Sequence, residues 1–229
     1  MNPKLNSGTI ETYYNDHSIV TFLTENLDNL SGTVLDIGCG KMKHKDLILS
    51  GKNVRNYRGL DLEEGKFVYK SKADIYWDGI TIPLQDNSID SAILFEVIEH
   101  CPDPNVVIKE ALRILKPGGV ILFSTPSIYH FHGMPHDYHR PSPSNLKLLF
   151  TDAGFSDVTI QSGGKWDTSL GQMISIWITQ RPMPKLLRKI LRRLHVPLFK
   201  LLLYLDKKYT GLPLENGTMV PNLLGKATK

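Results

Sequence analysis

The sequence has few of the features that mark secreted or membrane-spanning proteins. Its 229 residues include only two cysteines, Cys39 and Cys101, so a disulfide framework is excluded. The neighbours of these cysteines do not resemble a metal site, which favours a reducing compartment. No run of about 18 apolar residues is present, and the first sixteen residues lack an apolar core. We therefore expect no membrane-spanning helix and no signal peptide, and a cytoplasmic protein.

Charge is also unevenly distributed along the chain. The net charge is +4, and apolar residues make up 41%, as in an ordinary globular protein of one α/β domain. Between Arg181 and Lys208 there are nine lysines and arginines and one acid, Asp206, which gives this segment a charge of +8. The remainder therefore carries −4. A mildly acidic body with a basic arm differs from a uniformly basic protein in the partners it attracts.

Short apolar runs alternate with helical patterns over most of the chain, and no internal repeat is present. The apolar runs predict strands at 33–40, 57–62, 73–77, 88–97, 120–126 and 157–161. Residues 103–115 predict a helix, with Asp103 as its cap and Pro104 in its first turn, and 142–155 predict another. This alternation indicates an α/β fold with a parallel sheet and helices on both faces. Ligands on such sheets bind beyond the carboxyl ends of the strands.

The last third of the chain follows a different pattern. Residues 166–179 fit a helix or a strand, whereas 183–209 predict an amphipathic basic helix that Pro197 kinks or splits. The tail 222–229 fits a final strand. We therefore expect a core domain over 1–164 and a basic helical extension over 165–229.

The stretch VLDIGCGK predicts a ligand-binding turn after the first strand. Gly38 and Gly40 let the backbone turn sharply and approach a ligand closely. A dinucleotide site would have a third glycine, and Asp36 would repel a pyrophosphate but suits a cationic amino group. Asp61 closes the second strand, where a carboxylate accepts both hydroxyls of a ribose. A ligand with a ribose and an amino group but no phosphate indicates S-adenosylmethionine.

At this point the chain resembles the class I S-adenosylmethionine-dependent methyltransferases. The resemblance covers roughly residues 30–160 and rests on VLDIGCGK, GLDL, WDGITIPLQDNSIDSAILFEVIEHCPDP, EALRILKPGGVILFSTP and AGF in this order. It implies a Rossmann-like fold with a seven-stranded, mostly parallel sheet and the cofactor over Asp36, Gly38 and Gly40. It also implies Asp78 near the adenine amino group, with Asp74 as runner-up. Met42 departs from the family, which commonly has a glycine there.

The stretch EVIEH closes the fourth predicted strand. If the chain turns into a helix there, Glu96, Glu99 and His100 converge, and such a set suits Mg²⁺, Mn²⁺ or Zn²⁺. The pattern is similar to the metal-binding motif of ubiquinone-pathway O-methyltransferases and of small-RNA 2′-O-methyltransferases. The latter resemblance implies His132 or His130 as a fourth ligand. In the alternative interpretation, Glu96 lines the cofactor cleft while Glu99 and His100 cap a helix.

The stretch HFHGMPHDYHR holds four of the eight histidines and follows the fifth predicted strand. His132 is a candidate for the base that removes a hydroxyl proton, because an imidazole titrates near neutral pH. Asp137 is then a candidate for orienting the ring. Arg140 is a candidate for pairing with Asp137 or for holding an acidic or phosphorylated acceptor.

This stretch also resembles a bacterial subgroup with the signature P-x-x-x-x-H-G-x-P-x-D-Y-x-R, which is linked to cell-surface polysaccharide pathways. The alternative is a structural loop, shaped by Pro135, Asp137 and Arg140, with His136 and His139 in solvent.

These patterns predict a methyltransferase that acts on oxygen in a sugar or lipid-linked glycan. A small-molecule acceptor fits the same patterns. The basic helix at 185–208 is a candidate for peripheral contact with the inner face of a membrane, and a cap on the domain or a partner is its alternative. Nucleic acid is less favoured there, because aromatic residues are sparse. Two other functions stay open: a metal-dependent RNA ribose 2′-O-methyltransferase and a non-catalytic cofactor-binding scaffold.

Overall fold

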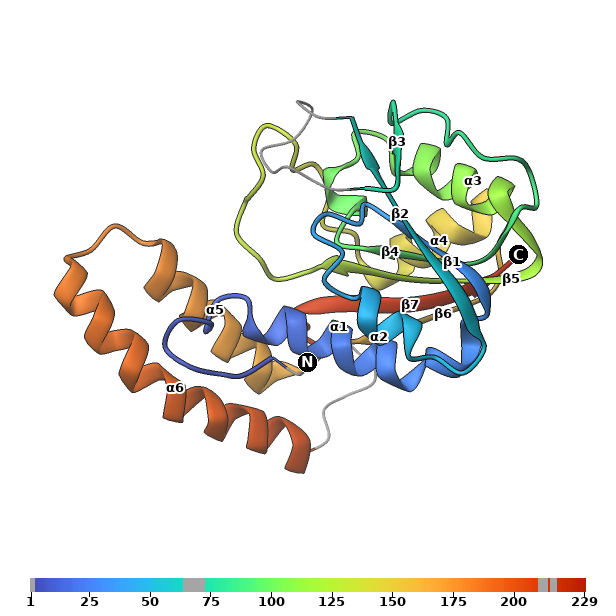
Figure 1. Ribbon diagram of the computed structural model, residues 1–229. Coiled ribbons are helices and arrows are strands. Elements are labelled where there is room, and N and C mark those ends of the chain that lie inside the picture. The colour runs from blue at the N-terminus through green and yellow to red at the C-terminus, as the bar shows by residue number, and fades with distance from the viewer. Residues whose placement is uncertain (1–2, 64–72, 210–213, 215–217) are drawn as a thin grey trace. The chain divides into compact units, whose positions relative to one another are not determined.

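The computed structural model describes residues 3–63, 73–209, 214 and 218–229 (Figure 1). Seven strands form one sheet in the order β3-β2-β1-β4-β5-β7-β6. The strands are β1 (Gly32–Ile37), β2 (Val54–Leu62), β3 (Ile75–Trp77), β4 (Ile89–Phe95), β5 (Leu115–Pro126), β6 (Ser156–Ser162) and β7 (Asn222–Thr228). The six strands expected within the core and the strand expected in the tail are all present. The predicted seven-stranded α/β fold is confirmed.

The sheet is mostly parallel. β1 pairs in parallel with β2 and β4, as do β2 with β3 and β4 with β5. β7 runs antiparallel to β5, since Gly118 at the start of β5 donates to the carbonyl of Lys229 beyond the end of β7. The strand order reverses between β1 and β4, and ligands in open α/β sheets bind at such a reversal.

Two helices begin at capping side chains, of which the sequence predicts the first, Asp103. Asp103 accepts a hydrogen bond from the backbone of Asn105 and begins α3 (Pro104–Ile114). Ser142 caps α4 (Pro143–Ala153) in the same way, and Gly154 ends it with a φ of +109°. α3 ends one residue earlier than predicted, because Leu115 already belongs to β5.

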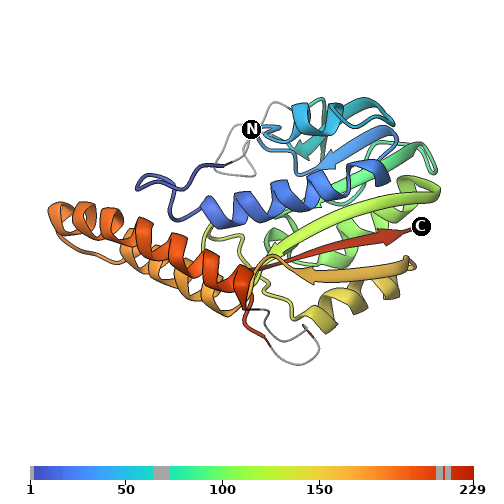
Figure 2. The same ribbon diagram turned by 90° about the horizontal axis from the view of Figure 1, so that it is seen from below.

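The remaining helices include two that the sequence did not predict. These two are α1 (Tyr13–Glu25) and the short α2 (Lys45–Leu49). The others are the 3₁₀ turns η1 (Leu27–Asn29) and η2 (Ile98–His100), α5 (Trp166–Gln180) and α6 (Lys185–Lys208). α2 lies on one face of the sheet and α3 and α4 on the other (Figures 1 and 2). The core between the layers is apolar and includes stacked rings of Phe123 and Phe150.

The chain divides into two compact units. Unit 1 consists of Met1–Val20, Pro126–His130 and Gln161–Leu223, and unit 2 of Thr21–Thr125, Phe131–Ile160 and Leu224–Lys229. The predicted boundary at residue 164 is linear, whereas this division is interleaved, because the chain leaves unit 2 for α5 and α6 and returns for β7.

The helices of unit 1 answer two questions that the sequence left open. Residues 166–180 form a helix, α5, and not a strand. α6 is one helix with Pro197 inside it, so the predicted split does not occur. Among the described residues, no helix is both long enough and apolar enough to cross a membrane.

Candidate active site

A cavity of about 590 Å³ in unit 2 opens at the carboxyl ends of β1, β2, β3 and β4. Its volume suits a cofactor-sized ligand. Four residues that the sequence predicts to bind the cofactor line it, namely Gly38, Asp61, Asp78 and Glu96. The cavity therefore lies where the topology places a ligand.

The glycine turn after β1 has the conformation that its sequence predicts. Gly38 and Gly40 have φ values of +76° and +49°, and a Cβ on Gly38 would lie 2.4 Å from Val97. The backbone N–H of Gly40 donates to Asp61 Oδ2 over 2.9 Å, which joins the turn to the end of β2. Met42 also has a positive φ, +53°, so the backbone keeps the shape that usually favours glycine.

Asp36 is buried at 5% exposure, and the described lining of the cavity does not include it. The hydroxyl of Tyr57 donates to Asp36 Oδ2 over 2.5 Å. Burial raises the pKa of Asp36 to about 7, and the neighbouring Asp61 adds to the rise. A cationic ligand would favour the ionised form of this carboxyl.

The two acids after β2 have different surroundings. Asp78 lines the cavity, and its Oδ1 accepts hydrogen bonds of 2.8 Å from the backbone N–H groups of Ile80 and Thr81. Asp74 instead accepts a hydrogen bond from the backbone of Gly59 over 2.7 Å and is not among the described lining residues. The geometry therefore favours Asp78 over Asp74 for the predicted contact with adenine.

Glu96 follows β4 in a strained conformation, with a φ of +56°. Ser124 on β5 holds it there: its hydroxyl donates to Glu96 Oε1 over 2.7 Å, and Glu96 N–H points back at Ser124. This contact directs Glu96 to the cavity wall. No sequence pattern indicates Ser124, because Ser124 and Glu96 meet only across neighbouring strands.

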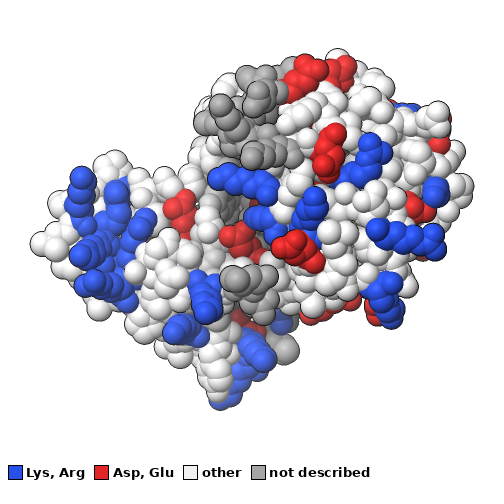
Figure 3. Space-filling model, viewed as in Figure 1, with Lys and Arg blue, Asp and Glu red and all other residues white. Residues whose placement is uncertain are grey.

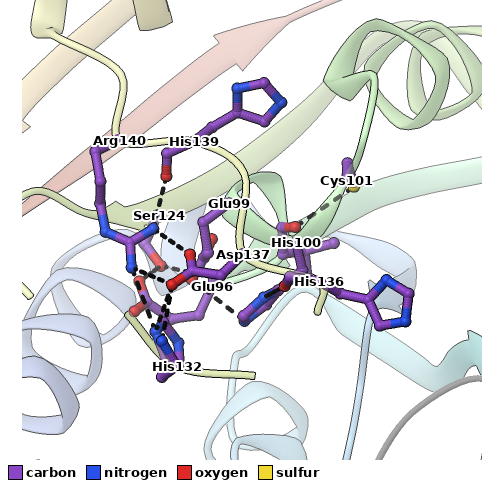
Figure 4. A network of polar contacts seen from close by, with 11 residues as sticks. Glu96, Glu99, His100, Cys101, Ser124, His132, His136, Asp137, His139 and Arg140 are labelled. Carbon is purple, nitrogen blue, oxygen red and sulfur yellow. Dashed lines mark hydrogen bonds and ion pairs between the residues drawn. The ribbon is translucent and has the colours of Figure 1, made fainter. Parts of the chain in front are cut away.

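Three of the predicted metal ligands come together next to the cavity. One ligand atom from each of Glu99, His100 and His132 lies within 4.8 Å of the others (Figure 4). This cluster does not include Glu96, whose carboxylate is engaged by Ser124. Glu99 is fully buried, and neither of its carboxylate oxygens has a hydrogen-bond partner within the described part of the chain. Burial first, and then the nearby Glu96, raises the pKa of Glu99 well above its usual range.

His100 has a defined orientation. Its Nδ1 lies 2.5 Å from the carbonyl oxygen of His136, so Nδ1 carries the proton and Nε2 has the lone pair. Burial lowers the pKa of His100, although the bond to His136 acts against this. His100 is therefore neutral near pH 7, and it lines the cavity together with His136. The sequence predicted His100 as a metal ligand or, in the alternative, as a helix cap, and treated His136 as solvated.

The histidine loop is built around an ion pair. Arg140 donates to both oxygens of Asp137, over 2.6 and 3.0 Å, and the backbone N–H of His132 donates to Asp137 Oδ2 over 2.8 Å. Burial acts to raise the pKa of Asp137, but the hydrogen bonds from Arg140 outweigh it and hold the pKa below its ordinary value. This buried pair fixes the loop in the way the structural interpretation expected.

His132 differs from the expected base. Arg140 Nη2 lies 3.3 Å from His132 Nδ1, and since arginine can only donate, Nδ1 accepts and Nε2 carries the proton. The described lining of the cavity includes none of His132, Asp137 and Arg140. The predicted ring-orienting role of Asp137 is also different, because its hydrogen bond goes to the backbone of His132, and its Oδ2 is 3.7 Å from the ring.

The other two histidines of the histidine loop, His130 and His139, lie outside the cluster of Glu99, His100 and His132. His130 belongs to unit 1, where its Nε2 is 3.9 Å from Glu11 Oε1. His139 is partly exposed, with its Nε2 3.2 Å from the carbonyl oxygen of Pro102. Of the two candidates for a further metal ligand, the structure therefore brings His132, and not His130, to Glu99 and His100.

Comparisons with known proteins agree with this geometry. A methyltransferase domain family matches residues 11–160. A protein of Mycolicibacterium smegmatis named "Probable S-adenosylmethionine-dependent methyltransferase" is 37% identical over 133 residues, 53% of this chain and 51% of that protein. A ubiquinone biosynthesis O-methyltransferase of Pseudomonas savastanoi is 28% identical, over 72% of this chain and 76% of that protein.

The fold agrees with a solved structure as well. A SAM-dependent methyltransferase from Archaeoglobus fulgidus aligns with a TM-score of 0.58 and 17% identity, over 96% of this chain and 97% of that one. The chain spans about half the length of the first curated relatives that it matches. Because the family match covers residues 11–160 of 229, the chain belongs to the methyltransferase domain family.

Proposed function

We propose that this chain transfers a methyl group from S-adenosylmethionine to a hydroxyl group, and that the acceptor is a sugar or a lipid-linked glycan. The observation that carries the proposal is the position of His100. Its Nε2 lone pair belongs to a neutral imidazole on the wall of the cavity that Gly38 and Asp61 also line. The proposed proton acceptor and the turn proposed to bind the nucleoside therefore line one cavity.

The cofactor-binding part of the proposal rests on four residues. Gly38 lines the cavity and lets the backbone approach a ligand, and Asp61, which accepts a hydrogen bond from the turn, would hold the ribose. Asp78 would contact the adenine amino group, and Asp36 would pair with the cationic end of the ligand. When bound, S-adenosylmethionine supplies an electrophilic methyl group on a sulfonium.

The catalytic part rests on His100. An acceptor hydroxyl within hydrogen-bond reach of Nε2 would transfer its proton there as the oxygen attacks, while the carbonyl of His136 holds Nδ1–H and stabilises the imidazolium. General-base catalysis of this kind contributes roughly 10²- to 10⁴-fold in rate. Glu96 borders the same cavity and can orient the acceptor.

The cluster also fits a divalent metal in two respects. Glu99 has two buried oxygens without a partner in the described residues, and His100 donates through Nδ1 to a backbone carbonyl, as metal-binding histidines do. The proton that Arg140 imposes on His132 Nε2 counts against it. Mg²⁺, Mn²⁺ or Zn²⁺ held by Glu99, His100 and His132 would act as a Lewis acid on an acceptor hydroxyl. As a ligand, His100 would use its Nε2 lone pair on the metal and could not serve as the base, so the two arrangements are separable by chelation.

The glycan acceptor rests on weaker support. From His132 to Arg140 the histidine loop resembles the signature of the subgroup linked to cell-surface polysaccharides. On the same loop the rings of Phe131 and Tyr138 are exposed at 79% and 44%, which offers apolar faces to a sugar ring. Sugars also present the adjacent hydroxyl groups that the base or a metal would engage.

The test is transfer of label from methyl-labelled S-adenosylmethionine to a cell extract, followed by separation of glycan, lipid, RNA and small-molecule fractions. We expect label in the glycan or lipid fraction. His100→Gln should lower the rate at least 100-fold and leave S-adenosylhomocysteine binding unchanged. His139→Gln, the same substitution at a partly exposed histidine outside the described cavity lining, should leave the rate unchanged.

The other outcomes decide between the alternatives. Label in RNA, lost on chelation and restored by a divalent ion, would establish the RNA ribose methyltransferase instead. Activity unaffected by His100→Gln would remove His100 as the base. Cofactor binding without transfer to any fraction would indicate a non-catalytic scaffold.

A further inference from the structure

Helix α6 of unit 1 has a continuous row of exposed apolar side chains. Successive members are mostly three or four residues apart, so they follow one side of the helix. This α6 apolar stripe consists of Leu186, Leu187, Ile190, Leu194, Leu198, Leu201 and Tyr204, each between 42% and 70% exposed. The opposite side of the helix buries His195, Phe199 and Leu202. Single exposed leucines are common on proteins, but a stripe along a 24-residue helix marks an interaction surface.

Basic side chains run beside this stripe. They are spaced four or seven residues apart, which places them along one edge, and all are exposed. This basic rim consists of Lys185, Lys189, Arg193, Lys200 and Lys207. The one acid of α6, Asp206, accepts hydrogen bonds from the backbone of Lys165 and the hydroxyl of Thr168 at the start of α5. The rim is therefore not neutralised by its own helix.

A small basic cavity lies next to the first turns of α6. Its volume is about 270 Å³, and it is lined by Ser7, Gly8, Lys185, Arg188, Lys189 and Arg192. The Nε atoms of the two arginines are buried and have no hydrogen-bond partner within the described part of the chain. The positive end of the helix dipole adds to the four cations. An oxyanion such as phosphate would supply the missing acceptors. Lysines and arginines gather over this end of α6 in Figure 3.

We propose that α6 docks unit 1 on a bilayer that contains anionic phospholipid. The apolar stripe lies among the upper acyl chains, the basic rim lies at the headgroups, and the basic cavity takes a lipid phosphate. Amphipathic helices with a basic polar face bind bilayers in this way, and anionic lipid attracts the bases. RNA would match the charge of the rim but would leave the leucines without a partner.

Helix α5 provides an internal contrast. It also exposes an apolar row, Trp166, Leu170, Met173 and Trp177, but its sequence from 166 to 180 contains no lysine or arginine. Apart from Ile178, its buried residues are small or polar. If exposed apolar area alone caused binding, substitutions on α5 and α6 would have similar effects.

The experiment is co-sedimentation of the full chain, without cofactor, with vesicles of phosphatidylcholine alone or mixed with phosphatidylglycerol. Lys189→Glu should weaken binding to the mixed vesicles about 25-fold, because each unit of charge near an anionic surface is worth about fivefold in affinity. Leu194→Ser should weaken it about tenfold, and Arg192→Ala should weaken it as well. The matched controls Leu170→Ser on α5 and Lys147→Glu on α4 should bind like the parent chain, and all five sites are exposed or partly exposed.

The proposal is supported if the parent chain binds the mixed vesicles, if the three α6 variants bind them more weakly, and if high salt weakens the binding. Absence of vesicle binding overturns it, as does equal loss with Leu170→Ser or binding to RNA only. No methyl transfer is measured, so this result is separate from that of the transfer experiment.

Discussion

The substitution Asp36→Asn should stabilise the ligand-free protein and weaken its binding of the cofactor. Asp36 is buried, and its pKa is raised to about 7 from an ordinary value of 3.8. A raised pKa means that the folded state binds a proton that the unfolded state has already released. The stability that this proton contributes is therefore fully present below pH 3.8 and falls as pH rises to about 7. Above that pH the buried carboxylate is ionised and the contribution is lost.

The magnitude follows from the difference between the two pKa values. At about 1.36 kcal/mol per pKa unit, the ionised carboxyl lowers the free energy of unfolding by up to about 4 kcal/mol above pH 7. Asparagine is neutral at every pH and keeps an oxygen that can accept the hydrogen bond of Tyr57. The variant should therefore have a free energy of unfolding that exceeds the parent value by this amount at pH 8 and equals it near pH 4.

Urea unfolding at several pH values measures this difference, and calorimetric titration with S-adenosylhomocysteine measures binding. Asp152→Asn, at an exposed site on α4, is the matched control and should change neither quantity. If the free energies of unfolding of the parent and of Asp36→Asn change in parallel with pH, Asp36 is not a buried carboxyl with a raised pKa. Unchanged affinity for S-adenosylhomocysteine would remove Asp36 from the binding site.

Three further substitutions test single contacts in the α5–α6 pair and in the histidine loop. Gly171→Ala should lower the free energy of unfolding by about 1–3 kcal/mol, because its Cβ would lie 2.3 Å from the ring of Phe199; an unchanged melting temperature would contradict this packing. Asp206→Ala should cost about 1–2 kcal/mol by removing the acceptor at the start of α5, measured by thermal denaturation. Asp137→Asn should cost about 2 kcal/mol at pH 7 by breaking the ion pair with Arg140. Since the pKa of Asp137 is lowered, its stabilisation is lost as pH falls through that pKa, so the variant and the parent should converge in acid.

The sequence predicted the sheet and the cofactor turn because both depend on neighbouring residues. Apolar runs ending in turn residues mark buried strands, and Gly38 and Gly40 mark a backbone with positive φ. Asp103 predicts the start of α3 because a single side chain next to the helix supplies the capping hydrogen bond. α1 went unpredicted because its apolar residues do not follow a clear helical period.

The roles of the histidines depend on contacts between distant parts of the chain. His100 has a usable Nε2 only because the carbonyl of His136, in another loop, holds its other nitrogen. His132, the stronger candidate by sequence, instead accepts from Arg140. A tautomer is set by its hydrogen-bond partner, and periodicity carries no information about a partner more than thirty residues away.

The amino-acid sequence by itself determined the order of the seven strands, the helices α3, α4 and α6, the glycine turn and the candidate set of acids and histidines, since each follows from local backbone and side-chain preferences. Only the tertiary structure decided which of these side chains meet. It separated Glu96 from Glu99 through Ser124, placed His100 rather than His132 on the cavity wall, and turned the leucines of α6 outward beside a basic rim. Burial and hydrogen-bond partners arise from packing between segments, and packing is a property of the folded chain.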